Sequence, residues 1–190
     1  MSGDFYWFTQ QEDKIIIAAV DCTGHGVPGA FMSMVGNTLL NQIVIERGIT
    51  RPAEILNQLH QEIRSALKQE EDSYSRDGMD IALCTIHQDV HILEFAGANR
   101  PLFFLKNQAL EEIAGDKMSI GGVRRHNERP FQNHIIKLQE GEECTIYLSS
   151  DGYADQFGGA QNRKFMVRNF KRLLVELSRQ QSLKSQHLNL

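Results

Sequence analysis

Five acidic residues stand where an apolar segment of the sequence meets a turn. They are Asp4, Asp21, Asp77, Asp80 and Asp151. Two of them, Asp21 and Asp151, end β-branched runs and are followed by glycine within a few residues, and a glycine there lets another group approach the backbone closely. An ionised carboxylate at the end of a buried strand is costly unless a cation compensates its charge. The pattern therefore raises the question of which cation these acids serve.

Carboxylate oxygens are the ligands that Mg²⁺ and Mn²⁺ prefer. Two such ions about 3.5–4 Å apart can hold a phosphoryl group and activate a bound water. If Asp4, Asp21 and Asp151 converge, the sequence predicts a site for a metal pair. The alternative is that each acid is solvated or caps its turn, and that His25 in "TGHG" is a turn histidine bonded to backbone.

The elements that must position these residues follow from hydrophobic periodicity. Two strands that can form a hairpin are followed by two amphipathic helices, then by further strands joined by short turns, and then by a last helix. The predicted strands cover residues 5–9, 14–20, 81–87, 90–96, 101–106, 134–138 and 144–149, and the predicted helices cover 28–46, the segment from about 51 to 67, and 163–179. We expect the strands over 81–106 to form a meander and the apolar stripe from Phe31 onward to face the core. The order predicts an α+β fold, with antiparallel sheets flanked by helices.

Composition narrows the class of protein. The chain has 190 residues, enough for one domain, 41% hydrophobic residues and a net charge of −4, which gives no reason to expect a nucleic-acid partner. Its three cysteines are widely spaced, which favours a reducing, cytoplasmic compartment. No apolar run approaches the ~20 residues of a membrane span, and the N-terminus does not resemble a signal peptide.

Five motifs occur in a fixed order along nearly the whole chain. They are "SGDFYWF" (2–8), "VDCTGHGVPGAFMS" (20–33), "GMDIALC" (78–84), "GANRPLFF" (97–104) and "LSSDGYADQFGG" (148–159). Together they resemble the SpoIIE-like branch of the metal-dependent serine/threonine phosphatases, the type 2C superfamily. The resemblance implies a sandwich of two antiparallel sheets with helices packed outside, an αββα arrangement, over a single domain 1–190 whose residues 171–190 are a polar helix end and tail.

The same resemblance implies a site with two Mn²⁺ or Mg²⁺ ions. Asp4 would help hold one ion, Asp21 would bridge both, the carbonyl of Cys22 would add a backbone ligand and Asp151 would complete the pair. His25 matches the position that protonates the leaving oxygen in type 2C enzymes, and imidazole has a suitable pKa range for that step. Asp77 or Asp80 would bind a third, weaker ion.

The sequence also departs from the family pattern. Trp7 stands where a second acid often follows "DFY", and no pair of acids follows Phe170, where family members place a metal ligand. The chain also begins on "SGD", where family members have an earlier strand. We therefore expect a chain truncated at both ends, whose open strand edges allow a homodimer by strand exchange.

Three functions are open at this point. The first is a bacterial signalling phosphatase acting on phosphoserine or phosphothreonine of an anti-sigma-factor antagonist-like domain through a metal-activated water, with a sensor domain upstream in the parent protein. The second is a catalytically silent phosphatase-like binding module. The third is a metal-dependent enzyme of small phosphate esters or nucleotides, against which stands the lack of a P-loop or dinucleotide fingerprint.

Overall fold

The fold begins with an antiparallel sheet whose strand order is β1-β2-β3-β4-β8, with β7 added beside β3. The computed structural model describes residues 3–69, 77–106, 109–122, 129–158 and 162–178. The strands of this first sheet are β1 (Phe5–Gln11), β2 (Lys14–Cys22), β3 (Gly78–His87), β4 (Ile92–Ala98), β7 (Ile120–Gly121) and β8 (His134–Lys137). The β1–β2 hairpin predicted from the two β-branched segments is confirmed.

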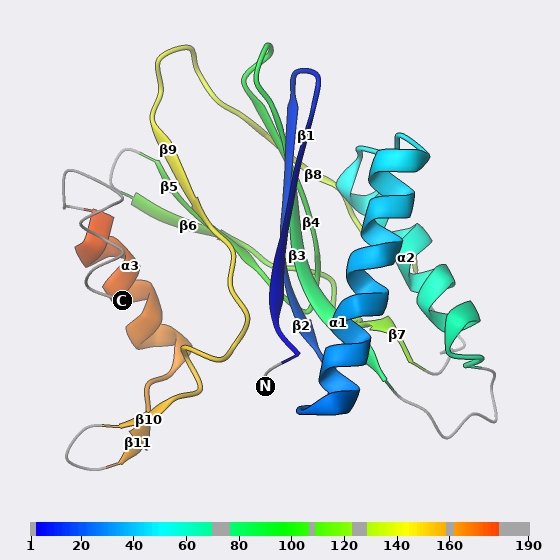
Figure 1. Cartoon of the computed structure of the whole chain (residues 1–190). Coiled ribbons are helices and arrows are strands. Elements are labelled where there is room, and N and C mark those ends of the chain that lie inside the picture. The colour runs from blue at the N-terminus through cyan, green and yellow to red at the C-terminus, as the bar shows by residue number, and fades with distance from the viewer. Residues whose placement is uncertain (1–2, 70–76, 107–108, 123–128, 159–161, 179–190) are drawn as a thin grey trace.

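Helical segments cover one face of the first sheet (Figure 1). They are α1 (Val27–Leu40), the π-helical continuation η1 (Asn41–Glu46) and α2 (Pro52–Ala66). Pro28 and Pro52 stand in the first turns of α1 and α2, where a missing N–H costs nothing. Buried side chains of α2 and η1, such as Leu59 and Ile43, pack with Ile81 and Leu83 of β3 in one core. This core holds β2 and β3 in place from the helix-covered face of the sheet.

A second sheet has the order β6-β5-β9 and packs on the other face of the first sheet. Its strands are β5 (Leu102–Lys106), β6 (Ala109–Ile113) and β9 (Cys144–Tyr147). Phe95 of β4 and Phe104 of β5 belong to the core between the sheets. The outer face of the second sheet is covered by α3 (Val167–Ser178), through Phe103, Phe170 and Leu174. The layers are therefore helix, sheet, sheet, helix, as Figure 1 shows, and the predicted α+β class with antiparallel sheets flanked by helices is confirmed.

Three details of the prediction were wrong. The strands over 81–106 are not one meander, because β5 leaves the first sheet and pairs with β6 and β9 in the second. The last helix begins at Val167 rather than Arg163, because Arg163–Lys164 form β11 and pair with β10 (Phe157–Gly158). The helix stripe from Phe31 is only partly core: Phe31 and Met34 are exposed, and α1 instead buries Met32, Gly36 and Leu40.

Among the described residues, no helix is long and apolar enough to cross a membrane. The predicted polar tail lies outside the described residues from position 179 onward, and the expected truncation of the chain stays a prediction.

Candidate metal centre

Two of the predicted acids lie directly opposite each other in the first sheet. Asp21 near the end of β2 pairs in register with Asp80 near the start of β3. Side chains of directly opposed residues emerge on the same face of a sheet. The register therefore brings two carboxylates together from positions 59 residues apart in the sequence (80 − 21 = 59).

The turn after Asp21 leads straight into α1. Gly24 and Gly26 both have positive φ, +90° and +66°, a backbone region that L side chains rarely adopt. Thr23 fastens the turn to β3, because its N–H donates to the Gly78 carbonyl at 2.9 Å and its hydroxyl accepts from the Gly78 N–H at 2.9 Å. His25 lies exposed at the tip. In the described part of the chain, its ring makes no hydrogen bond to the carboxylates.

Asp151 and Asp4 reach the same place from two other segments. Asp151 follows β9, in a turn closed by a 2.8 Å bond from the Asp155 N–H to the Asp151 carbonyl. Asp4 precedes β1 and is hydrogen-bonded to the side chain of Asp21. A Cβ atom on Gly152 would lie 3.8 Å from Asp4 Oδ2, which places Asp4 beside the Asp151 turn. The predicted convergence of Asp4, Asp21 and Asp151 is thus present in the structure.

The residue that joins these acids is Arg100. Its Nη2 atom lies 2.5 Å from Asp21 Oδ2, 2.8 Å from Asp151 Oδ2 and 3.4 Å from Asp80 Oδ2. One Nη2 carries two hydrogens, so Asp21 and Asp151 take the hydrogen bonds and Asp80 interacts mainly through its charge. We refer to Asp4, Asp21, Asp80 and Asp151 as the acidic cluster.

The electrostatics of the cluster pull in opposite directions. Burial raises the pKa of Asp21 to about 6; Arg100 lowers it, and the charges of Asp4 and Asp151 raise it again. For Arg100, burial lowers the pKa, but the hydrogen bond to Asp151 and the charges of Asp21, Asp151 and Asp80 outweigh burial and raise it. Three carboxylates thus face one guanidinium, with Asp4 beside Asp21, and the negative charge is in excess. Such a cluster favours additional positive charge.

The donor chemistry of the cluster fits a hard divalent cation, although its present arrangement is that of a guanidinium site. Within the described residues, no group of three or more His, Cys, Asp or Glu side chains is arranged to hold a metal ion. The acids nevertheless offer only oxygen donors, and three of them already share one cation. The acids of the cluster are therefore the candidates to hold Mg²⁺ or Mn²⁺, and Asp21 and Asp151 would first have to release Arg100.

The other predicted site residues are placed unevenly. Asp80 belongs to the acidic cluster, but its Oδ1 accepts hydrogen bonds from Ser119 Oγ at 2.7 Å and Asn99 Nδ2 at 2.9 Å. Asp77 is exposed and lies near the Thr23 hydroxyl, at 3.5 Å. Cys22 is buried at the end of β2. The sequence prediction assigned no role to Arg100, Asn99 or Ser119, although Asn99 and Arg100 lie within the motif "GANRPLFF".

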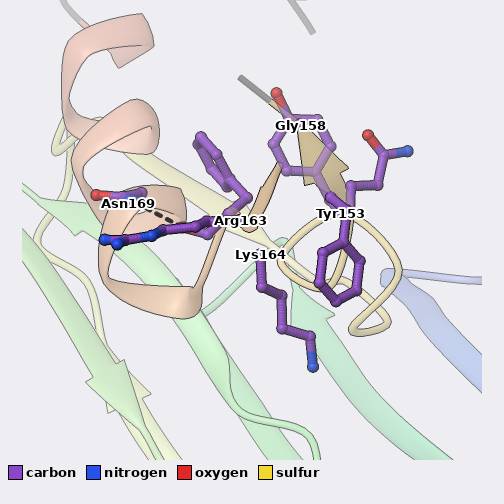
Figure 2. A pocket seen from close by; sticks show the side chains of 8 residues that line it. Tyr153, Gly158, Arg163, Lys164 and Asn169 are labelled. Carbon is purple, nitrogen blue, oxygen red and sulfur yellow. Dashed lines mark hydrogen bonds between the residues drawn. The ribbon is translucent and has the colours of Figure 1, made fainter. Parts of the chain in front are cut away.

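A pocket of about 360 Å³ opens beside Tyr153, which follows Asp151 in the turn after β9, and Figure 2 shows the side chains that line it. It lies between the turn, the β10–β11 hairpin and the start of α3. Its walls combine aromatic rings, amides and two basic side chains: Tyr153, Gln156, Phe157, Gly158, Arg163, Lys164, Phe165 and Asn169. Lys164 is paired with Asp155 at 2.7 Å. We call this cavity the hairpin pocket.

The fold is that of a phosphatase domain of the SpoIIE/PP2C type. The chain belongs to the family of Stage II sporulation protein E (SpoIIE), whose model matches residues 11–188. The resemblance predicted from the five motifs is therefore confirmed.

Individual relatives agree with this family. The chain is 26% identical over 159 residues to phosphoserine phosphatase RsbU of Bacillus subtilis (strain 168), covering 82% of this chain and 43% of RsbU. It thus spans less than half the length of that curated relative. The SiaA-PP2C domain of Pseudomonas aeruginosa superposes with a TM-score of 0.84 at 34% identity, over 97% of this chain and 70% of that one. RsbX, solved in complex with magnesium, shares the fold with a TM-score of 0.67 at 12% identity, over 100% of this chain and 78% of RsbX.

Proposed function

We propose that this domain is a metal-dependent protein phosphatase that hydrolyses phosphoserine or phosphothreonine on a bacterial signalling protein. The observation that carries the proposal is the convergence of Asp21, Asp80 and Asp151, from three separate segments, on a single cationic nitrogen. Membership of the SpoIIE family and the similarity to the phosphoserine phosphatase RsbU support it. That RsbX was solved with magnesium supports Mg²⁺ or Mn²⁺ as the cofactor.

In this proposal each residue has a definite task. Asp4, Asp21 and Asp151, with the carbonyl of Cys22, hold the metal pair, and Asp77 or Asp80 is the candidate for a third ion. The two ions, when bound, neutralise phosphoryl charge and lower the pKa of a bound water. His25 stands exposed in the turn between β2 and α1, where its imidazole can give a proton to the leaving oxygen of the substrate.

The hairpin pocket is the candidate contact for the protein part of the substrate. Tyr153, which lines the pocket, lies two residues after Asp151. The Asp151–Asp155 turn therefore connects the hairpin pocket to the acidic cluster. Basic side chains beside exposed Phe157 suit an acidic segment with an apolar residue. We propose an anti-sigma-factor antagonist-like domain as the phosphoprotein, a cytoplasmic setting and an upstream sensor in the parent protein, with a homodimer as an alternative to a monomer.

The decisive experiment is hydrolysis of an aryl phosphate and of a phosphoserine peptide during a Mn²⁺ titration. The variants are Asp21→Asn and Asp89→Asn, which make the same chemical change. Asp89 is exposed in the turn at the opposite end of β3 and serves as the control. We expect Mn²⁺-dependent turnover that falls by about 10² or more in Asp21→Asn, because electrostatic stabilisation of the transition state is lost, and that persists in Asp89→Asn. Equal turnover in the two variants would refute the role of the acidic cluster.

The second candidate function is a phosphatase-like binding module without turnover. The contact that favours it is the Arg100 guanidinium, which binds the carboxylates that a metal would need. A folded domain that binds a phosphoprotein but hydrolyses none of the substrates at millimolar Mn²⁺, both in this chain and in the longer parent, would establish this alternative.

A further inference from the structure

The backbone of Arg100 is held in place by close packing that does not involve its side chain. A Cβ atom on Gly97 would lie 2.2 Å from the Arg100 carbonyl oxygen, and one on Gly115 would lie 2.5 Å from it. Only glycine fits at such separations. Asn99 adopts a positive φ of 56°, and its N–H donates to the Asp116 carbonyl at 2.7 Å. Arg100 therefore leaves β4 in a constrained turn that aims it at the acidic cluster.

The side chain of Arg100 is mostly buried, with 15% of its surface exposed. Its Nε is buried and has no hydrogen-bond partner among the described residues. A guanidinium with a purely structural role would stabilise the fold most if each of its N–H groups donated a hydrogen bond. Here one nitrogen makes the ionic contacts with Asp21, Asp80 and Asp151, and the buried Nε contributes none.

Asp80 offers the Arg100 guanidinium an alternative ion-pair partner. Its Oδ1 is held by Ser119 and Asn99, which leaves Oδ2 facing Arg100 at 3.4 Å. A small rotation of Arg100 away from Asp21 and Asp151 can strengthen this contact and keep the guanidinium paired. Asp80 can thus retain Arg100 when the other two acids bind something else.

We propose that Arg100 is a built-in competitor of the divalent cation. The guanidinium binds Asp21 and Asp151, a metal ion must displace it from both, and Asp80 receives it when it leaves. Arg100 is thus a positioning residue that sets the metal concentration at which the site forms. This inference rests on the proposed function for the identity of the metal, but it concerns binding and not turnover.

Competition predicts two effects in a variant that lacks the guanidinium: lower thermal stability without metal, and higher affinity for Mn²⁺. In Arg100→Gln, the acids lose their cation, so the melting temperature in EDTA should fall. The Mn²⁺ dissociation constant should also fall, by about tenfold or more, because no contact with a charged group has to be broken before the metal binds. Arg47→Gln is the matched control, because Arg47, which follows η1, pairs with Glu62 of α2 at 2.9 Å. It should leave the Mn²⁺ affinity unchanged.

The experiment is calorimetric titration of Mn²⁺ into the whole chain without substrate, with thermal unfolding in EDTA and in Mn²⁺. Weaker or unchanged Mn²⁺ binding by Arg100→Gln would overturn the proposal, because a merely structural arginine would give that result. If Arg100→Gln fails to fold, Arg100→Lys decides: the shorter ammonium side chain competes less well for Asp21 and Asp151, so Mn²⁺ should bind more tightly, and weaker or equal binding would overturn the proposal. Tighter Mn²⁺ binding without hydrolysis would uphold this inference and reject the proposed phosphatase activity.

Discussion

Asp21 and Asp80 face each other as direct partners of the antiparallel β2–β3 pair. Like charges at directly opposed positions destabilise a sheet, and the Arg100 guanidinium offsets that repulsion by contacting both carboxylates. Asp80 is further held by the Ser119 hydroxyl. The stability of this end of the sheet therefore depends on polar contacts that the strands themselves do not supply.

The contact between Ser119 and Asp80 should contribute measurably to stability. Ser119→Ala removes the 2.7 Å hydrogen bond to Asp80 and the 2.9 Å bond from Asn99. Because the acceptor is a charged carboxylate, we expect the free energy of unfolding to fall by about 1.5–3 kcal/mol. Denaturant unfolding in EDTA measures it. Ser178→Ala at the end of α3, where the Ser178 hydroxyl donates to the Val175 carbonyl of its own helix, is the control. Equal losses in the two variants would contradict a special role for Ser119.

Much of the secondary structure could be predicted from the sequence, because it depends on local patterns. The β-branched run that forms β2 and the prolines that begin α1 and α2 were sufficient signals. The local sequence pattern could not predict that β5 joins the second sheet. The chain changes sheets through the turn at Asn99, where close packing against Gly115 directs it, and that packing involves residues distant in sequence.

The same reason explains which site residues were found. Asp21 and Asp151 were visible as acids that end strands. Arg100 was not, because its role comes from the meeting of β2, β3 and the β9 turn around it. The exposed positions of Phe31 and Met34 were also unreadable, since an apolar helix face does not reveal whether the fold covers it.

The hairpin pocket should affect protein substrates more than small ones. Arg163→Glu reverses a charge in the pocket without breaking the Lys164–Asp155 ion pair. If an acidic segment binds there, KM for the phosphoprotein should rise about tenfold, because charge reversal at a docking site costs affinity. The kinetics with an aryl phosphate should stay unchanged, since it has no segment to dock. Lys137→Glu on β8 is the control. An equal effect on both substrates would show that Arg163 acts on the acidic cluster instead.

The three free cysteines should differ sharply in reactivity. Burial raises the pKa of the Cys84 thiol in the core between the sheets, where the side chain is fully buried. Burial and the neighbouring Glu142 raise the pKa of Cys144 as well, but Cys144 is only partly buried. Since the thiolate is the reacting form, a disulfide reagent should modify Cys144 first, and faster as the pH rises. Cys144→Ser should abolish the fast phase, and rapid modification of Cys84 in the folded protein would be inconsistent with this order.

The start of α1 should transmit its position to the turn that joins Asp21 of β2 to α1. A Cβ atom on Gly29 would lie 2.8 Å from the Gly24 carbonyl oxygen, and Ser33 Oγ lies 2.7 Å from the carbonyl oxygen of Gly3, next to Asp4. Gly29→Ala must therefore push the turn away from α1, and we expect weaker Mn²⁺ binding and a loss of about 1–3 kcal/mol in stability from the forced shift. Met34→Ala is the matched control on the same helix, because 66% of Met34 is exposed and it lies outside the core. Calorimetric Mn²⁺ titration of the two variants tests this coupling. Unchanged Mn²⁺ affinity in Gly29→Ala, with the fold intact, would mean that α1 does not control the site.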